Sequence, residues 1–168
     1  YLGPREGWKP DNAGTWRSVG EHRPSDNHPV VNTCALDAEA FCRWLNASAP
    51  PGTTYRLPTE AEWEFACRAG GDGLWGHGDD ERELVKYAVF GNQKGAPRPV
   101  AGLRPNAFGL YDMHGNHAEW CAGTGADLRP VRGGKFVNVA GQVRSAAREW
   151  LPPRSVEAGF RVLRAIAE

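Results

Sequence analysis

The chain has 168 residues, with 20 Lys and Arg residues balanced by 20 Asp and Glu residues. This length suits one domain with a single core. The balanced charge argues against the broad basic surface that is expected of a protein that binds nucleic acid. The 21 Gly, 13 Pro and 7 Trp residues favour a turn-rich fold over a helical bundle, and no apolar run approaches the roughly 20 residues of a membrane span.

Residues 1–27 are predicted to form an extended N-terminal arm, because turn dipeptides interrupt the segment and its aromatics are isolated. Trp8 and Trp16 are the residues expected to attach this arm to the rest of the chain. Residues 28–168 then form the domain proper.

A first helix is predicted after Thr33, whose hydroxyl suits an N-cap. Apolar residues at helical spacing follow, and the Pro-Pro-Gly sequence at 50–52 marks the end. The apolar stripe comprises Ala38, Phe41, Cys42 and Leu45.

A second helix is signalled more strongly. Thr59 and Glu62 form a capping-box pattern directly after a proline, and the glycines at 70–71 end the helix. Its buried face is expected to be Trp63, Ala66 and Cys67. The two helices should contact the core through Phe41, Trp44, Trp63 and Phe65 or their neighbours.

The rest of the chain is predicted to be loops and short strands. Residues 72–94 form a loop whose acidic run 79–81 should be solvated. Three strands are expected at 131–137, 143–148 and 160–164 because apolar residues partly alternate there between glycines and prolines. One α+β domain is the economical interpretation.

The segment 109–120 combines large apolar residues with a Gly115-Asn116 turn and two carboxylates. A loop that folds back leaves backbone groups without partners. Two interpretations stay open: Asp112 and Glu119 hold a hard cation, or they accept hydrogen bonds and brace the loop themselves.

Five motifs in one order and spacing resemble the formylglycine-generating enzyme (sulfatase-modifying factor) family. The motifs lie at 56–66, 109–120, 132–134, 144–148 and 159–161. The resemblance implies an irregular C-type-lectin-like fold of the α+β class, with two helices, short antiparallel strands and much loop. The core would contain Trp63, Phe108, Tyr111, Trp120, Phe136 and Phe160.

The resemblance also implies a structural Ca²⁺ in the 109–120 loop. The positions that match the family's ligands are Asp112, Gly115, His117 and Glu119. A second family calcium site needs an Asn where this chain has Val89, so it is not carried over.

The family's oxidase uses two cysteines near the C-terminus to bind copper(I) and convert a substrate cysteine to formylglycine. This chain has no cysteine after Cys121, and soft thiolates are what stabilise copper(I). Lys135 replaces a family Ser and Ala118 replaces a family Trp. We therefore expect no copper and no catalytic residues.

The four cysteines are predicted to be buried, reduced thiols. In secreted relatives, the cysteines that match Cys42 and Cys67 form disulfides with positions that correspond here to Val162 and Ser145. The missing partners and the lack of a recognisable signal peptide favour a cytoplasmic location.

The expected function is ligand binding by a C-terminal loop surface, on a monomer, with a protein, peptide or other ligand as partner. Its residues lie between the structural motifs, in segments that line the family's substrate groove. They are Lys135, Val137, Val139, Gln142, Glu149, Trp150, Arg154, Val156 and Glu157. The alternatives are an active or degenerate oxidase and a regulatory domain of a longer protein.

The segment 132–161 also resembles the variable region of proteins that retroelements diversify. In those proteins the fold is a rigid platform for scrambled binding residues. Lys135, Glu149 and Trp150 are not reached by the usual adenine-only changes, so the sequence leaves this interpretation open.

Overall fold

A computed structural model describes residues 25–93, 95–123, 125 and 127–167. Most of the predicted N-terminal arm, with Trp8 and Trp16, lies outside these residues. Among the described residues, no helix has both the length and the apolar character needed to cross a membrane.

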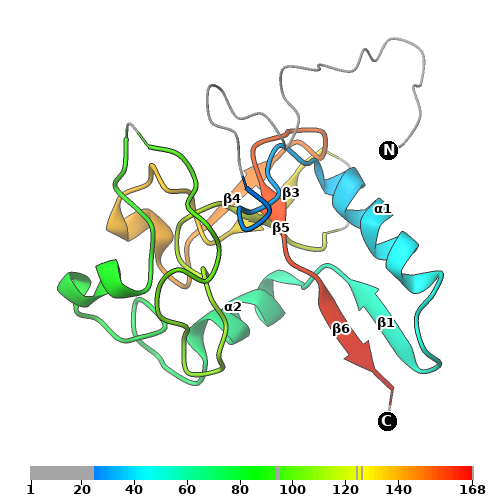
Figure 1. Ribbon diagram of the computed structural model, residues 1–168, viewed down its shortest axis with the longest axis horizontal. Coiled ribbons are helices and arrows are strands. Elements are labelled where there is room, and N and C mark those ends of the chain that lie inside the picture. The colour runs from blue at the N-terminus through cyan, green and yellow to red at the C-terminus, as the bar shows by residue number, and fades with distance from the viewer. Residues whose placement is uncertain (1–24, 94, 124, 126, 168) are drawn as a thin grey trace.

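The described chain is a mixed α+β structure with short elements joined by long loops (Figure 1). The helices are α1 (Ala35–Asn46) and α2 (Glu60–Arg68), with 3₁₀ turns η1 (Glu81–Lys86) and η2 (Ala140–Val143). The strands are β1 (Thr53–Arg56), β2 (Glu119–Trp120), β3 (Arg129–Arg132), β4 (Arg148–Leu151), β5 (Gly159–Phe160) and β6 (Leu163–Ile166).

The strands form two small sheets. In one sheet the order is β4-β3-β2-β5, and in the other β1 pairs with β6. The β4–β3, β3–β2 and β1–β6 pairs are antiparallel, as predicted, whereas β2 and β5 are parallel. In Figure 1, α1 and the β1–β6 ribbon lie on one side of the larger sheet, and the long loops after α2 lie on the other.

The predicted strand positions need correction. The strand at 131–137 is instead β3, which ends at Arg132 because Gly133 and Gly134 take positive φ angles of 89° and 75°. Residues 143–147 form no strand, and β4 begins at Arg148. The strand at 160–164 is divided between β5 and β6, which lie in different sheets.

Helix α1 begins one residue later than the N-cap prediction implied. Cys34 is the N-cap, and its N–H donates to the Asp37 carboxylate at 3.1 Å. The Thr33 hydroxyl instead donates to the carbonyl of Ala158 at 3.0 Å, so it links the start of the helix to the C-terminal segment.

Helix α2 confirms the capping-box prediction. Glu62 N–H donates to the Thr59 hydroxyl, and Thr59 N–H donates to the Glu62 carboxylate at 2.9 Å. Arg56 of β1 binds both oxygens of the same carboxylate at 2.6 Å. The hydrogen bonds from Arg56, and then those of the cap, lower the pKa of Glu62 to about 2.

The packing of the helices differs from the prediction. Trp63 and Cys67 of α2 are buried, but Phe41, Trp44 and Phe65 are exposed. Helix α1 contacts the core through small residues, because these allow its backbone to approach the sheet closely. They are Ala35, Ala38 and Cys42.

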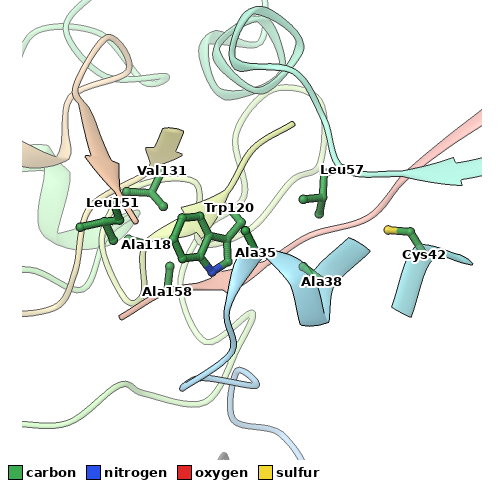
Figure 2. Packing of buried hydrophobic residues seen from close by; sticks show 9 residues of the cluster. All are labelled: Ala35, Ala38, Cys42, Leu57, Ala118, Trp120, Val131, Leu151 and Ala158. Carbon is green, nitrogen blue, oxygen red and sulfur yellow. The ribbon is translucent and has the colours of Figure 1, made fainter. Parts of the chain in front are cut away.

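Trp120 lies at the centre of the main buried cluster (Figure 2). Its indole N–H donates to the Thr33 carbonyl at 2.9 Å, so the polar edge of the ring is satisfied inside the core. Of the predicted core, Trp63 and Trp120 are buried, and Phe136 and Phe160 are half-buried. Phe108 and Tyr111 are 52% and 40% exposed, so their prediction as core residues was wrong.

A largely buried ion pair joins α2, β2 and the segment after β5. Arg161 donates to both oxygens of Glu119, at 2.5 and 2.6 Å, and the Trp63 indole N–H donates to the same carboxylate at 2.7 Å. These contacts close sequence separations of 42 and 56 residues. The carboxylate thus accepts three donors from two distant segments.

Replacing Arg161 with Met should destabilise the protein by about 3 kcal/mol, because it leaves the Glu119 charge shielded from water without its partner. Urea unfolding measures this loss. Lys86→Gln is the control: it removes the exposed pair with Glu83 and should change stability by less than ~0.5 kcal/mol. Equal effects of the two variants would contradict the central role of the Glu119 pair.

Candidate functional site

The turn in the 109–120 loop depends on a glycine. Gly115 has a φ of 72°, and a Cβ there would lie 2.1 Å from the Val89 carbonyl oxygen. Its N–H donates to the Gly133 carbonyl at 2.8 Å. The next residue, Asn116, is buried and bonds both backbone groups of Arg98 through its side chain. The loop is therefore fixed to two other parts of the chain.

The proposed calcium ligands are committed in part to other contacts. Glu119 is neutralised by Arg161, and one oxygen of Asp112 accepts the Ala101 N–H at 2.7 Å. The His117 ring contacts the Ala118 carbonyl at 3.2 Å. Within the described part of the chain, no three His, Cys, Asp or Glu side chains are arranged to hold a metal ion. Ca²⁺ is coordinated by roughly 6–8 oxygen atoms, and these side chains alone supply too few of them.

Calcium binding by this loop thus stays a prediction, and it depends on backbone oxygens. Thermal melting of one sample with added Ca²⁺ and of a second sample with EDTA in its place tests this prediction. An ion bound only by the folded chain raises the midpoint of thermal unfolding. We expect EDTA to lower the midpoint if Gly115 and His117 supply ligands beside Asp112. An unchanged midpoint would contradict the calcium assignment.

His114 is a buried residue that holds three segments together. Its Nε2 accepts the Gly76 N–H at 2.9 Å, so the Nδ1 atom carries the proton and donates to the Val143 carbonyl at 2.8 Å. Burial lowers the pKa of His114 to about 4. The neutral ring is therefore structural at physiological pH.

The free energy of unfolding should fall as pH drops from 6.5 towards 4, because the imidazole of the unfolded chain binds its proton first. The loss should be roughly 3 kcal/mol. Chemical denaturation at pH 7 and pH 4 measures it. His114→Asn should remove the His114 share of this dependence and leave that of His117, whose pKa burial also lowers. His28→Asn should retain the full dependence; equal slopes in the two variants would contradict the assignment.

All four cysteines are free. Cys42, Cys67 and Cys121 are buried as predicted, and Cys34 is half-buried. Burial raises the pKa of Cys67 to about 12 and also raises the pKa of Cys121, so both stay protonated at neutral pH. Protonated thiols are poor nucleophiles and poor metal ligands.

A groove of about 510 Å³ lies between the β3–β4 pair and the loop that contains η2. We call it the C-terminal groove. It is lined by Ala118, Val131, Arg132, Gly134, Asn138, Gly141, Gln142, Arg144, Ala146, Ala147, Arg148 and Glu149. Its volume falls in the range typical of small-ligand sites.

The structure divides the predicted binding residues. Gln142 and Glu149 line the groove. Lys135 instead pairs with Glu157 at 2.8 Å, and this contact lowers the pKa of Glu157. The remaining residues lie outside the groove lining: Val139, Trp150, Arg154 and Val156 are exposed, and Val137 is half-buried.

Three arginines of the groove were missed by sequence reasoning, which treated Arg132, Arg144 and Arg148 as structural motif residues. Arg132 is indeed structural: it is 2% exposed, pairs with Glu64 and Glu60 of α2, and lies over the Trp63 ring at 5.4 Å. The side chains of the other two arginines are exposed at the groove. A tally of charge in the segment 132–149, which holds three Arg, one Lys and one Glu, would have indicated them.

The backbone around the groove is tied to the rest of the protein. Gly91 N–H donates to the Asn138 carbonyl at 2.7 Å, and Asn92 N–H donates to the Phe136 carbonyl at 2.9 Å. Within the loop, the Gln142 side chain accepts from the Asn138 amide and from the Val139 N–H. The groove wall is therefore held in shape by hydrogen bonds from both sides.

Comparisons with known proteins agree with this architecture. A family model described as Sulfatase-modifying factor enzyme 1-like domain matches residues 6–166. The chain is 34% identical over 152 residues to inactive C-alpha-formylglycine-generating enzyme 2 of Mus musculus, covering 79% of this chain and 47% of that protein. It is 34% identical over 172 residues to the formylglycine-generating enzyme of Streptomyces coelicolor, covering 80% and 52%.

Among solved structures, Treponema denticola variable protein 1 is similar, with a TM-score of 0.74 and 25% identity over 90% of this chain and 80% of that chain. The predicted C-type-lectin-like fold of the formylglycine-generating-enzyme type is thereby confirmed. The chain spans about half the length of the two curated relatives.

Proposed function

This chain belongs to the sulfatase-modifying factor enzyme 1-like family, and from that membership we propose that it is a non-catalytic module that binds a ligand in the C-terminal groove. The observation that carries the proposal is the groove itself, about 510 Å³ in volume and lined by residues of the motifs at 132–134 and 144–148 and of the segments beside them. The partner would be a protein segment, a peptide or a small molecule.

The absence of thiols from the groove supports a binding role over oxidation. No cysteine follows Cys121 in the chain, and none of the four lines the groove. Cys67 and Cys121 pack with Trp63 and Met113 in a separate buried cluster. The copper chemistry of the family oxidase therefore has no soft ligands in this segment.

The position of β4 supports recognition of an extended ligand. It is the edge strand of its sheet, and among the described residues no strand pairs with its outer side. Arg148 and Glu149 of β4 line the groove. An edge strand beside a groove can hydrogen-bond a peptide backbone while side chains enter the groove.

The structural similarity to Treponema denticola variable protein 1 supports the same proposal. In the diversified proteins that this segment resembles, the residues between fixed motifs carry recognition. A fixed wall with exposed side chains fits that division, because a preformed site loses less conformational entropy on binding. The relatives named as formylglycine-generating enzymes favour the alternative, an oxidase of sulfatase cysteines.

Filling the groove tests the proposal. A Cβ on Gly141 would meet no atom within 4 Å, so Gly141→Trp places a large side chain in the groove without a backbone clash. We expect a random heptapeptide phage library to be enriched on the wild-type protein and the selected phage to bind Gly141→Trp at least about tenfold less tightly.

Gly102→Trp is the matched control, because Gly102 is exposed and does not line the groove. It should bind the selected phage as the wild type does. Failure to enrich any phage, or equal binding by both Trp variants, would contradict groove binding. Conversion of a Cys-x-Pro-x-Arg peptide to its aldehyde with copper(I) and oxygen, detected by mass, would establish the oxidase alternative.

A further inference from the structure

We propose that the ligand enters the C-terminal groove through an anionic group, a carboxylate or a phosphate, held between Arg144 and Arg148. This inference rests on the proposed function and specifies the chemistry of its ligand. Its basis is the unequal way in which the three arginines of the groove are neutralised.

Arg132 already has its counter-charges. Its guanidinium pairs with Glu64 and lies 3.8 Å from Glu60, both on α2, and it donates to the carbonyls of Ala146 and Ser145 at 3.3 and 3.1 Å. Its Nε, however, is a buried donor with no partner among the described residues. A buried N–H without an acceptor is costly, so the Arg132 side chain is balanced in charge but not fully satisfied in hydrogen bonds.

Arg148 lies directly opposite Arg132 in the β3–β4 register. Side chains at directly opposed positions share one face of a sheet, so Arg148 lies beside an arginine whose charge Glu64 and Glu60 already balance. The described residues provide no ion pair to Arg148, whose side chain is exposed. An anion bound beside Arg148 would supply the counter-charge that this side chain lacks.

Arg144 is positioned at the end of η2. Its Nε donates to the Gly141 carbonyl at 2.7 Å, which orients the guanidinium and leaves the terminal nitrogens for a ligand. Two guanidinium groups on one groove suit an oxyanion, because each presents a planar pair of donors that matches carboxylate or phosphate oxygens.

Glu149 is the acid that opposes this assignment. It is adjacent to Arg148 and lines the same groove, but its partner across the strands is Val131 rather than an arginine. Neighbouring residues of a strand point to opposite faces, so Glu149 does not lie on the face that Arg132 and Arg148 share. Because Glu64 and Glu60 balance Arg132, the lining holds two arginines without an ion pair against one glutamate.

Thermal melting at constant ionic strength tests the inference with three probes: inorganic phosphate, hexaglutamate and hexalysine. We expect phosphate, hexaglutamate or both to raise the wild-type midpoint by a few degrees, and hexalysine to leave it unchanged. A response to phosphate alone identifies a phosphate ligand, and a response to hexaglutamate alone identifies a carboxylate ligand.

The double variant Arg144→Gln/Arg148→Gln should lose the response. Without probe its midpoint should stay close to that of the wild type, because both side chains are exposed and neither forms an ion pair with the described residues. Arg43→Gln/Arg164→Gln, an equal charge change at two exposed residues outside the groove lining, is the control and should keep the response. A shift that persists in the double variant, or no shift with either anion, would overturn the inference.

The peptide selection separates this inference from the function on which it rests. Enriched peptides rich in Asp and Glu support both. Enriched peptides that depend on the groove but lack acidic residues would refute the anion and leave ligand binding intact. No enrichment would refute the proposed function itself.

Discussion

The carboxylate of Glu119 is the contact on which the remaining structure depends. It accepts hydrogen bonds from Arg161 and from the Trp63 indole, and so joins β2 to the C-terminal segment and to α2. The larger sheet alone could not hold these segments, since its strands β2 and β5 have only two residues each. A shielded ion pair with three donors supplies the specificity that short strands lack.

The groove is built on this framework rather than on secondary structure of its own. The Arg132 guanidinium lies over the Trp63 ring and donates hydrogen bonds to the carbonyls of residues 145 and 146. A residue that binds helix, strand and loop at once fixes the groove wall without touching the solvent. Exposed side chains such as Arg144 can then vary without loss of the fold, which is how loops carry function on a rigid scaffold.

The same framework explains why the loop of residues 109–120 stays ordered. Asn116 bonds Arg98, Gly115 bonds Gly133, and His114 bonds residues 76 and 143. Most buried polar groups of the loop are satisfied by the protein. The sequence left two interpretations open for Asp112 and Glu119. Internal hydrogen bonding accounts for the Glu119 carboxylate, and calcium binding by the loop stays a prediction that needs backbone oxygens as ligands.

The sequence by itself determined the family, the α+β class and helix α2, because these depend on signals a few residues long: spaced motifs, a capping box and a glycine stop. It did not determine which aromatics are buried, where β4 begins, or that Arg132 faces Arg148. Those features depend on pairings between distant segments, such as Thr33 with Ala158 and Trp63 with Glu119. Only the tertiary structure brings these groups together, so only it could locate the groove and its unequally neutralised arginines.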